Sequence, residues 1–176
     1  MSERTYPDEP ADPFPAPPLS FTDGDGREIT VETTDRDIFE SLVEMYVAFD
    51  PADRAQGIPP VKEEAIREWL DTLLTEGSLN VVARHDDGPV GHAILVPDRG
   101  DAYELAVFVL GAYQSAGIGT QLLQALLGYG QREGVDRVWL TVERWNEPAI
   151  ALYEKLGFVT SDTESFELEM AIRLVD

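Results

Sequence analysis

A stretch of 27 residues, from Leu105 to Gln131, carries no charged side chain, although the 176-residue chain has a formal net charge of −21. A glycine-bearing turn lies near its centre, between a strand-like run and a helix-like run. The turn reads Gln114-Ser115-Ala116-Gly117-Ile118-Gly119-Thr120. Its glycines and the change of period exclude a continuous apolar membrane span and predict a strand, a turn and a helix in succession.

Such a turn is suited to hold an anion. The first N–H groups of a helix have no partner within the helix, and the helix dipole favours negative charge there. Gly117 and Gly119 would let a phosphate approach the backbone closely, although Gly-x-Gly is also common in tight turns without a ligand. A dinucleotide fingerprint needs a glycine at Leu122, and a P-loop needs a Gly-Lys-Ser/Thr that this chain lacks. Because the turn interrupts an acidic surface, we expect a polyphosphate to dock there.

Acidic residues outnumber basic ones throughout the chain, 34 to 13. This balance excludes a nucleic-acid binder, which needs a basic patch for the phosphates. Only two lysines occur, Lys62 and Lys155. A solvated surface adapted to high salt, of the halophilic type, is the interpretation favoured over a cationic partner, since salt screens a field of one sign.

Cysteine is absent, which excludes disulfides, thiol nucleophiles and thiolate metal sites, and no metal site is expected. The N-terminus lacks the basic flank and apolar core of a signal peptide, so we expect a cytoplasmic protein without a membrane partner. Six prolines and several acids fill residues 1–26, which we expect to form a disordered arm, and residues 27–176 are expected to form one domain.

Alternating periodicities predict an α/β domain with a mixed, mostly antiparallel sheet flanked by helices, in the order β-α-α-β-β-β-α-β-α-β-β. The expected strands are Glu28–Glu32, Leu79–Arg84, Val90–Val96, Ala102–Val109, Val135–Val142, Phe158–Val159 and Phe166–Leu174. The expected helices are Asp35–Phe49, Lys62–Leu74, one that follows the turn and ends at Gly134, and one that starts at Asn146 or Glu147 and ends at Gly157. In this last helix Asn146 and Tyr153 lie about 10 Å apart on nearly one face, so an amide and a phenol can line one groove.

Three segments, in this order and spacing, resemble the GNAT superfamily of N-acetyltransferases over about residues 27–174. They are Val109–Gln114 leading into Gln114-x-x-Gly117-x-Gly119, the strand end Leu140-Thr141-Val142 before Asn146, and Ala151–Phe158. The resemblance implies a GNAT-like domain in which acetyl-CoA lies in a V-shaped cleft, where the strands ending near Val109 and Val142 splay apart. The cofactor-binding residues that it implies are Val109, Leu110, Gln114, Ser115, Ala116, Gly117, Ile118, Gly119, Thr120 and Asn146.

The resemblance also implies catalytic roles. A backbone amide near Val109 or Leu110 would stabilise the charge that develops on the thioester oxygen, and Tyr153 would protonate the departing thiolate. Asn146 would bind the pantetheine or only cap its helix. Glu104 lies in the family's base-bearing strand, yet the two-residue period puts it on the face opposite its neighbours unless a bulge shifts the register.

Alternatives to Glu104 as the base are Glu143 and a chain of waters, whereas His92 is expected to be packed or solvated. The chain departs from the family pattern in two ways. Gly111 stands where proline is common, and Gln114 and Ser115-Ala116 stand where arginine or other basic residues are frequent. Phosphate binding would therefore depend on backbone amides.

The acceptor pocket is expected near Ala48–Val61, where carboxylates suit a cationic amine or serve only as caps. The candidate contacts there are Phe49, Asp50, Asp53, Arg54 and Ile58.

The predicted function is transfer of the acetyl group of acetyl-CoA to a primary amine of a small molecule or peptide, in a monomer or a homodimer. The alternative is a non-catalytic acyl-CoA-binding sensor or partner module of the same fold. These two functions differ in turnover, since only the first releases free thiol when an amine is supplied.

Overall fold

The computed structural model describes residues 4–49, 59–98, 100–162 and 167–175. Its eight described strands form one sheet in the order β1-β2-β3-β4-β5-β6-β8-β7. Every neighbouring pair is antiparallel except β5 and β6, which are parallel. The strands are β1 Leu19–Thr22, β2 Glu28–Thr34, β3 Leu79–His85, β4 Gly88–Pro97, β5 Ala102–Val109, β6 Arg137–Glu143, β7 Val159–Asp162 and β8 Glu167–Arg173.

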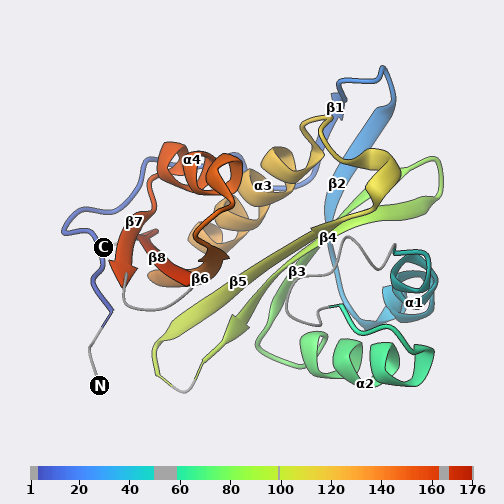
Figure 1. The fold of residues 1–176 in the computed structure, drawn as a ribbon, viewed down its shortest axis with the longest axis horizontal. Helices are drawn as coiled ribbons and strands as arrows, with labels where there is room; N and C mark the ends of the chain where they lie inside the picture. Colours follow the sequence, from blue (N-terminus) through green and yellow to red (C-terminus); the bar gives the residue numbers. More distant parts are fainter. Residues whose placement is uncertain (1–3, 50–58, 99, 163–166, 176) are drawn as a thin grey trace.

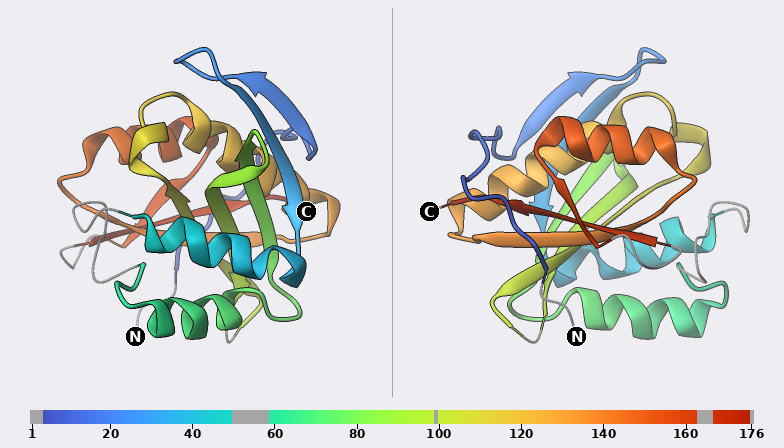
Figure 2. Two further views of the ribbon diagram at one scale, coloured as in Figure 1. Left: turned by 90° about the vertical axis from the view of Figure 1, so that its right-hand side faces the viewer. Right: turned by 60° about the vertical axis from the view of Figure 1, so that its left-hand side comes forward.

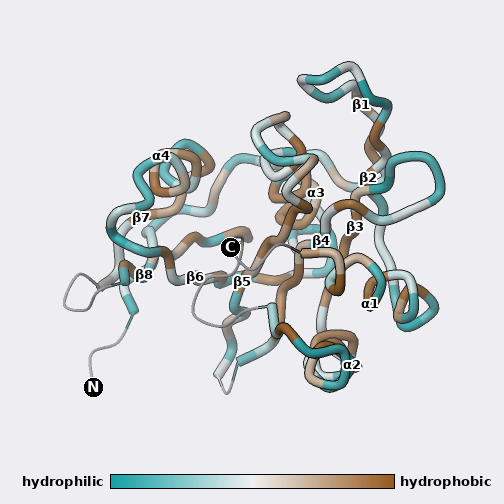
Figure 3. The backbone as a smooth tube through the Cα atoms, turned by 45° about the vertical axis from the view of Figure 1, so that its right-hand side comes forward, coloured by the Kyte–Doolittle hydropathy of each residue, from teal (hydrophilic) through white to brown (hydrophobic). Residues whose placement is uncertain are grey.

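Helices cover both faces of this sheet (Figure 1, Figure 2). The helices are α1 Phe39–Val47, α2 Glu63–Leu73, α3 Ile118–Arg132 and α4 Glu147–Leu156, with 3₁₀ turns η1 at Arg36–Ile38 and η3 at Gly111–Tyr113. The strands alternate between two cores: Val81 and Ala83 pack with α3, whereas Val82 between them packs with α1 and α2. Figure 3 shows the hydrophobic segments gathered along the central strands and α3, with hydrophilic segments in the β1–β2 turn and the outer helices.

The predicted α/β class and the predicted order of elements are confirmed from β2 onward. Asp35 caps the first helical turn as expected, because its side chain accepts a hydrogen bond from the Asp37 amide. The helix predicted over Asp35–Phe49 is divided into η1 and α1. No helix among the described residues is both long and apolar enough to cross a bilayer.

Parts of residues 4–26, a region within the expected disordered arm, contact the rest of the domain. β1 pairs with β2, and the Ala11 amide donates to the Arg173 carbonyl at 2.8 Å. Pro15 packs so tightly on Gly128 of α3 that a Cβ there would lie 2.4 Å from the Pro15 oxygen. The segment itself is poor in apolar side chains, but it packs on surface that α3 and the sheet edge supply.

A buried polar network crosses the core between the sheet and α1. His92 accepts from the Tyr46 hydroxyl at Nδ1 and donates from Nε2 to Asn80 Oδ1, both at 2.7 Å. Asn80 Nδ2 donates to the Leu73 carbonyl, which fixes the amide orientation and so the neutral tautomer of His92. Since His92 is fully buried, it is a packed histidine and not a base within reach of solvent.

This network predicts that acid weakens the fold. Burial lowers the pKa of His92 from 6.5 to about 3. The unfolded chain therefore binds a proton that the folded protein rejects, and stability that is complete above about pH 6.5 is lost as the pH falls towards 3. We expect wild type to have a larger free energy of unfolding in urea than His92→Gln at neutral pH. Below about pH 6 this difference should fall by about 1.4 kcal/mol for each pH unit. Parallel pH curves for the two proteins would contradict a neutral His92 in the native state.

Candidate active site

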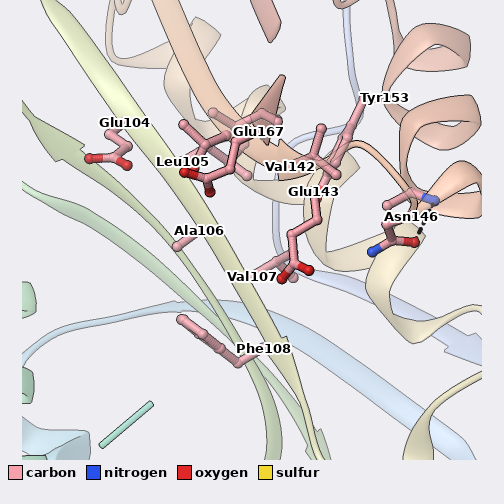
Figure 4. Close-up of a pocket in the computed structure, with 13 residues that line it drawn as sticks. Glu104, Leu105, Ala106, Val107, Phe108, Val142, Glu143, Asn146, Tyr153 and Glu167 are labelled. Carbon is pink, nitrogen blue, oxygen red and sulfur yellow. Dashed lines mark hydrogen bonds between the residues drawn. The ribbon is translucent and has the colours of Figure 1, made fainter. Parts of the chain in front are cut away.

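The parallel pair β5 and β6 separates soon after it forms. Pairing joins Ala102–Glu104 to Arg137–Trp139, and beyond these residues the two strands diverge. A cavity of about 270 Å³ occupies the gap. It is lined by Glu104–Phe108 of β5, Leu140–Glu143 of β6, Asn146, Ala149 and Tyr153 at α4, and Glu167 of β8 (Figure 4). The cavity thus lies at the one place among the described strands where two neighbours run parallel.

Amides of β5 point into this gap in alternation. Leu110 donates to the Val90 carbonyl, and Asp98 donates to the Ala102 carbonyl, both at 2.9 Å. No register shift separates these two ends, so even-numbered residues of β5 bond to β4. The amides of Val107 and Val109 therefore face the cavity side. Two amides are predicted as oxyanion donors. The amide of Val109 points toward the cavity, whereas the amide of Leu110 is already hydrogen-bonded to β4.

Tyr153 enters the cavity from α4. Its ring packs edge-on against Phe158, with centroids 5.7 Å apart, and among the described residues its hydroxyl has no hydrogen-bond partner. Burial raises its pKa above the ordinary value of 10.0, so the phenol is protonated at neutral pH. Tyr153 is only half-buried, and no fully buried side-chain oxygen among the described residues lacks a partner, so this hydroxyl is open to the cavity. It is therefore available to a ligand there.

Asn146 is the N-cap of α4, as one of its two predicted roles required. Its side-chain oxygen accepts from the Ala149 amide at 3.4 Å. Figure 4 shows this amide group at the cavity edge, beside Glu143 and below Tyr153. Capping occupies the oxygen of Asn146, and the Nδ2 donor is the group that remains to contact a ligand.

Glu104 lies on the face of β5 opposite Leu105, because no bulge shifts the register of this strand. It still lines the cavity, since the gap between β5 and β6 opens to both faces of the sheet. Burial raises the pKa of Glu104, Arg4 opposes this, and the charges of Asp98, Glu169 and Glu167 raise the pKa further. Glu104 is thus a partly exposed carboxylate with a raised pKa at the cavity wall.

The glycine turn, Gln114–Thr120, lies between the C-terminal end of β5 and α3 and includes the first residues of α3. Ser115 and Gly117 both have positive φ, +61° and +89°, and Gly117 caps α3 without a side-chain hydrogen bond. The amides of Ile118, Gly119 and Thr120 form the first turn of α3 and receive no side-chain cap from Gly117. The Ile118 side chain is buried, so only its backbone faces outward.

Two of the predicted cofactor residues, Gln114 and Ala116, make hydrogen bonds that hold the turn in place. Gln114 Nε2 donates to the Val109 carbonyl at 3.0 Å, and Ala116 is buried with its carbonyl bonded to the Gly24 amide at 2.9 Å. These contacts shape the turn, while Ser115 and Gly117 lie exposed.

Sequence reasoning missed Val107, Phe108 and Glu167, all of which line the cavity. The two-residue alternation from Val109 would have found Val107, but Glu167 enters only because β8 pairs with β6 and sets it opposite Glu143. Asp50, Asp53, Arg54 and Ile58, expected at the acceptor pocket, lie outside the described residues, and Phe49 is buried against Tyr46. Trp145, adjacent to Asn146, is 74% exposed.

The model of the Acetyltransferase (GNAT) family matches residues 39–158. Mycothiol acetyltransferase from Nocardia farcinica is 32% identical over 135 residues, which are 76% of this chain and 42% of the relative. The [ribosomal protein bS18]-alanine N-acetyltransferase of Escherichia coli K12 is 48% identical over 46 residues, 26% of this chain and 31% of the relative. The matches to these two curated relatives thus span less than half of their length.

Solved structures share the fold. The GNAT domain of S. lividans PAT superposes with a TM-score of 0.75 at 15% identity, covering 89% of this chain and 97% of that one. YncA of Salmonella typhimurium, solved with acetyl-CoA, gives a TM-score of 0.66 at 20% identity over 84% of this chain and 95% of that one. At these identities the similarity establishes the fold.

Proposed function

The chain belongs to the GNAT acetyltransferase family, and from this premise we propose that it transfers the acetyl group of acetyl-CoA to a primary amine. One observation carries the proposal: Tyr153 of α4 and Glu104 of β5 line the same cavity between β5 and β6. This cavity thereby offers a proton donor and a proton acceptor to one bound substrate.

Bound acetyl-CoA would extend from the glycine turn before α3 to the cavity between β5 and β6. The pyrophosphate would take the amides of Ile118, Gly119 and Thr120, where the dipole of α3 favours negative charge. The pantetheine would run between β5 and α4, past Asn146. The thioester carbonyl would then meet the amide of Val107 or Val109, which is aimed at the charge that develops on oxygen.

The chemical step is direct attack of the neutral amine on the thioester carbon. A C–N bond forms as the C–S bond breaks, and the amine proton passes to Glu104 directly or through water. Tyr153 donates its proton to the departing sulfur, a transfer between groups with ordinary pKa values of about 10 and about 8.5. The products are the acetylated amine and CoA with a free thiol.

Glu104→Gln should lower kcat/KM by about 10- to 100-fold and remove the acidic limb of the pH profile. Only the ionised carboxylate accepts a proton, so the wild-type rate should rise with pH through the raised pKa of Glu104. Steady-state assays of both proteins across pH test this. Glu143→Gln is the matched comparison, because Glu143 also lines the cavity. If Glu143→Gln removes the limb and Glu104→Gln does not, the role of base belongs to Glu143.

The acceptor amine is proposed as a small molecule or a peptide, since the two relatives are named for mycothiol and for the alanine of a ribosomal protein. Purified protein with acetyl-CoA and a panel of primary amines of both kinds should release free thiol only when an amine is present. Tight CoA binding without release across the panel would favour the alternative, a non-catalytic acyl-CoA sensor.

A further inference from the structure

The turn between β1 and β2 lies against the loop that leads into α3. The Gly24 amide donates to the Ala116 carbonyl at 2.9 Å, and Arg27 Nη1 donates to the Ala112 carbonyl at 3.1 Å. Ala112 and Arg27 are 85 positions apart in the sequence. Figure 1 shows the blue hairpin and the yellow loop at the same end of the molecule. The hairpin therefore supports the loop that the proposed function assigns to the cofactor phosphates.

Hydrogen bonds to Asp23 hold the hairpin turn in place. Its carboxylate accepts from the amides of Asp25 and Arg27 at 2.9 Å each, and from Arg27 Nε at 2.7 Å. Burial raises the pKa of Asp23, but the hydrogen bonds from Arg27 and Asp25 outweigh it and hold that pKa below its ordinary value. An ionised, fully buried Asp23 side chain thus fixes the direction of the Arg27 guanidinium.

Tyr113, within the same loop, is held from two strands. The Arg27 guanidinium carbon lies 4.0 Å from the centre of the Tyr113 ring, and the Tyr113 hydroxyl hydrogen-bonds to His85 Nδ1 at 2.7 Å. Arg27 directly precedes β2, and His85 ends β3. The loop is therefore attached to the sheet at Ala112, Tyr113 and Ala116.

The contact at Ala116 also orients a donor. In a trans peptide the C=O of one residue and the N–H of the next point in opposite directions. Because the Ala116 carbonyl points at Gly24, the Gly117 amide points away from the hairpin. It thereby extends the group of amides formed by the first turn of α3.

We propose that Arg27, held by Asp23, is a positioning residue that preorganises the loop from Gly111 to Gly117 for the phosphates of acetyl-CoA. The proposal rests on the proposed function. Asp23 and Asp25 offset the charge of Arg27, so its contribution is geometric. Besides these two carboxylates, the guanidinium contacts the Ala112 carbonyl and the Tyr113 ring of the loop. A loop ordered before binding spares the ligand the entropy cost of ordering it.

Arg27→Met should weaken CoA binding, measured by calorimetry, by about 10-fold and raise KM for acetyl-CoA similarly, with kcat within about 2-fold of wild type. Arg84→Met is the matched control. Arg84 likewise pairs with a carboxylate, Glu32, and donates to a turn carbonyl, that of Asp87. The alternation along β3 puts the Arg84 side chain on the face of the sheet opposite His85, which contacts the loop. Arg84→Met should leave CoA affinity unchanged.

Arg27→Lys provides the second test, because it keeps the charge and loses the fork, so it should weaken binding less than methionine does. If thermal denaturation shows that Arg27→Met is not folded, Arg27→Lys alone tests the proposal. Arg27 variants that bind CoA as tightly as wild type would overturn the proposal and leave the proposed function intact, and an equal loss in Arg84→Met would also overturn it. Failure of the wild-type protein to bind CoA would instead refute the proposed function itself.

Discussion

Tyr153→Phe should lower kcat by about 100-fold while the affinity for acetyl-CoA changes by less than about 2-fold. The substitution removes only the hydroxyl, and the ring keeps its contact with Phe158. The thiolate must then leave unprotonated or take its proton from water, which slows C–S cleavage and leaves binding intact. Steady-state kinetics give kcat, and calorimetry gives the affinity.

Tyr129→Phe controls for the loss of a tyrosine hydroxyl elsewhere in the same core. Tyr129 lies on α3, packs against the same hydrophobic cluster as Tyr153 and does not line the cavity between β5 and β6. Its removal should leave kcat unchanged. Normal turnover by Tyr153→Phe would exclude the phenol as the proton donor.

Gly117→Asp should weaken acetyl-CoA binding on the order of 30- to 100-fold. A carboxylate about 5 Å from a doubly charged pyrophosphate costs about 2–3 kcal/mol at an effective dielectric constant of about 40–60. Steric effects contribute little, because a Cβ at Gly117 would meet nothing within 4 Å. The backbone there has φ of +89°, which Asp and Asn tolerate better than most residues do.

Two variants separate charge from backbone strain in this experiment. Gly117→Asn has the same shape without the charge, so it should bind acetyl-CoA clearly more tightly than Gly117→Asp. Gly134→Asp places a carboxylate on a backbone of φ +83° beyond the other end of α3, also with nothing within 4 Å, and should bind as wild type does. Equal affinities for Gly117→Asp and Gly117→Asn, measured by calorimetry, would contradict phosphate docking at this turn.

The uncharged stretch predicted much of the fold because its pattern is local. It contains most of β5, the turn and nearly all of α3, and Gly117 stands at the helix start where a residue with positive φ is needed. The register of Glu104 was also predictable, since the alternation of a strand without a bulge depends on sequence alone. These features need no knowledge of distant segments.

Features set by distant partners escaped prediction. The amide of Leu110 is occupied because Val90 lies opposite, and Glu104 reaches the cavity because β6 diverges from β5. β1 has the alternation of a strand, but the prolines before it dominated the composition of the segment. The contacts of Arg27 with the phosphate loop likewise depend on how the hairpin packs.

In the proposed reaction the acetyl group passes directly from the thioester to an amine in the cleft between β5 and β6. The most direct test follows ¹³C-labelled acetyl-CoA by mass spectrometry, with an amine from the panel that supports thiol release. We expect equal molar amounts of labelled acetylamine and free CoA, no label on the protein, and an equal slowing of both products in Tyr153→Phe. Label recovered on the protein or as free acetate, without acetylated amine, would contradict direct transfer.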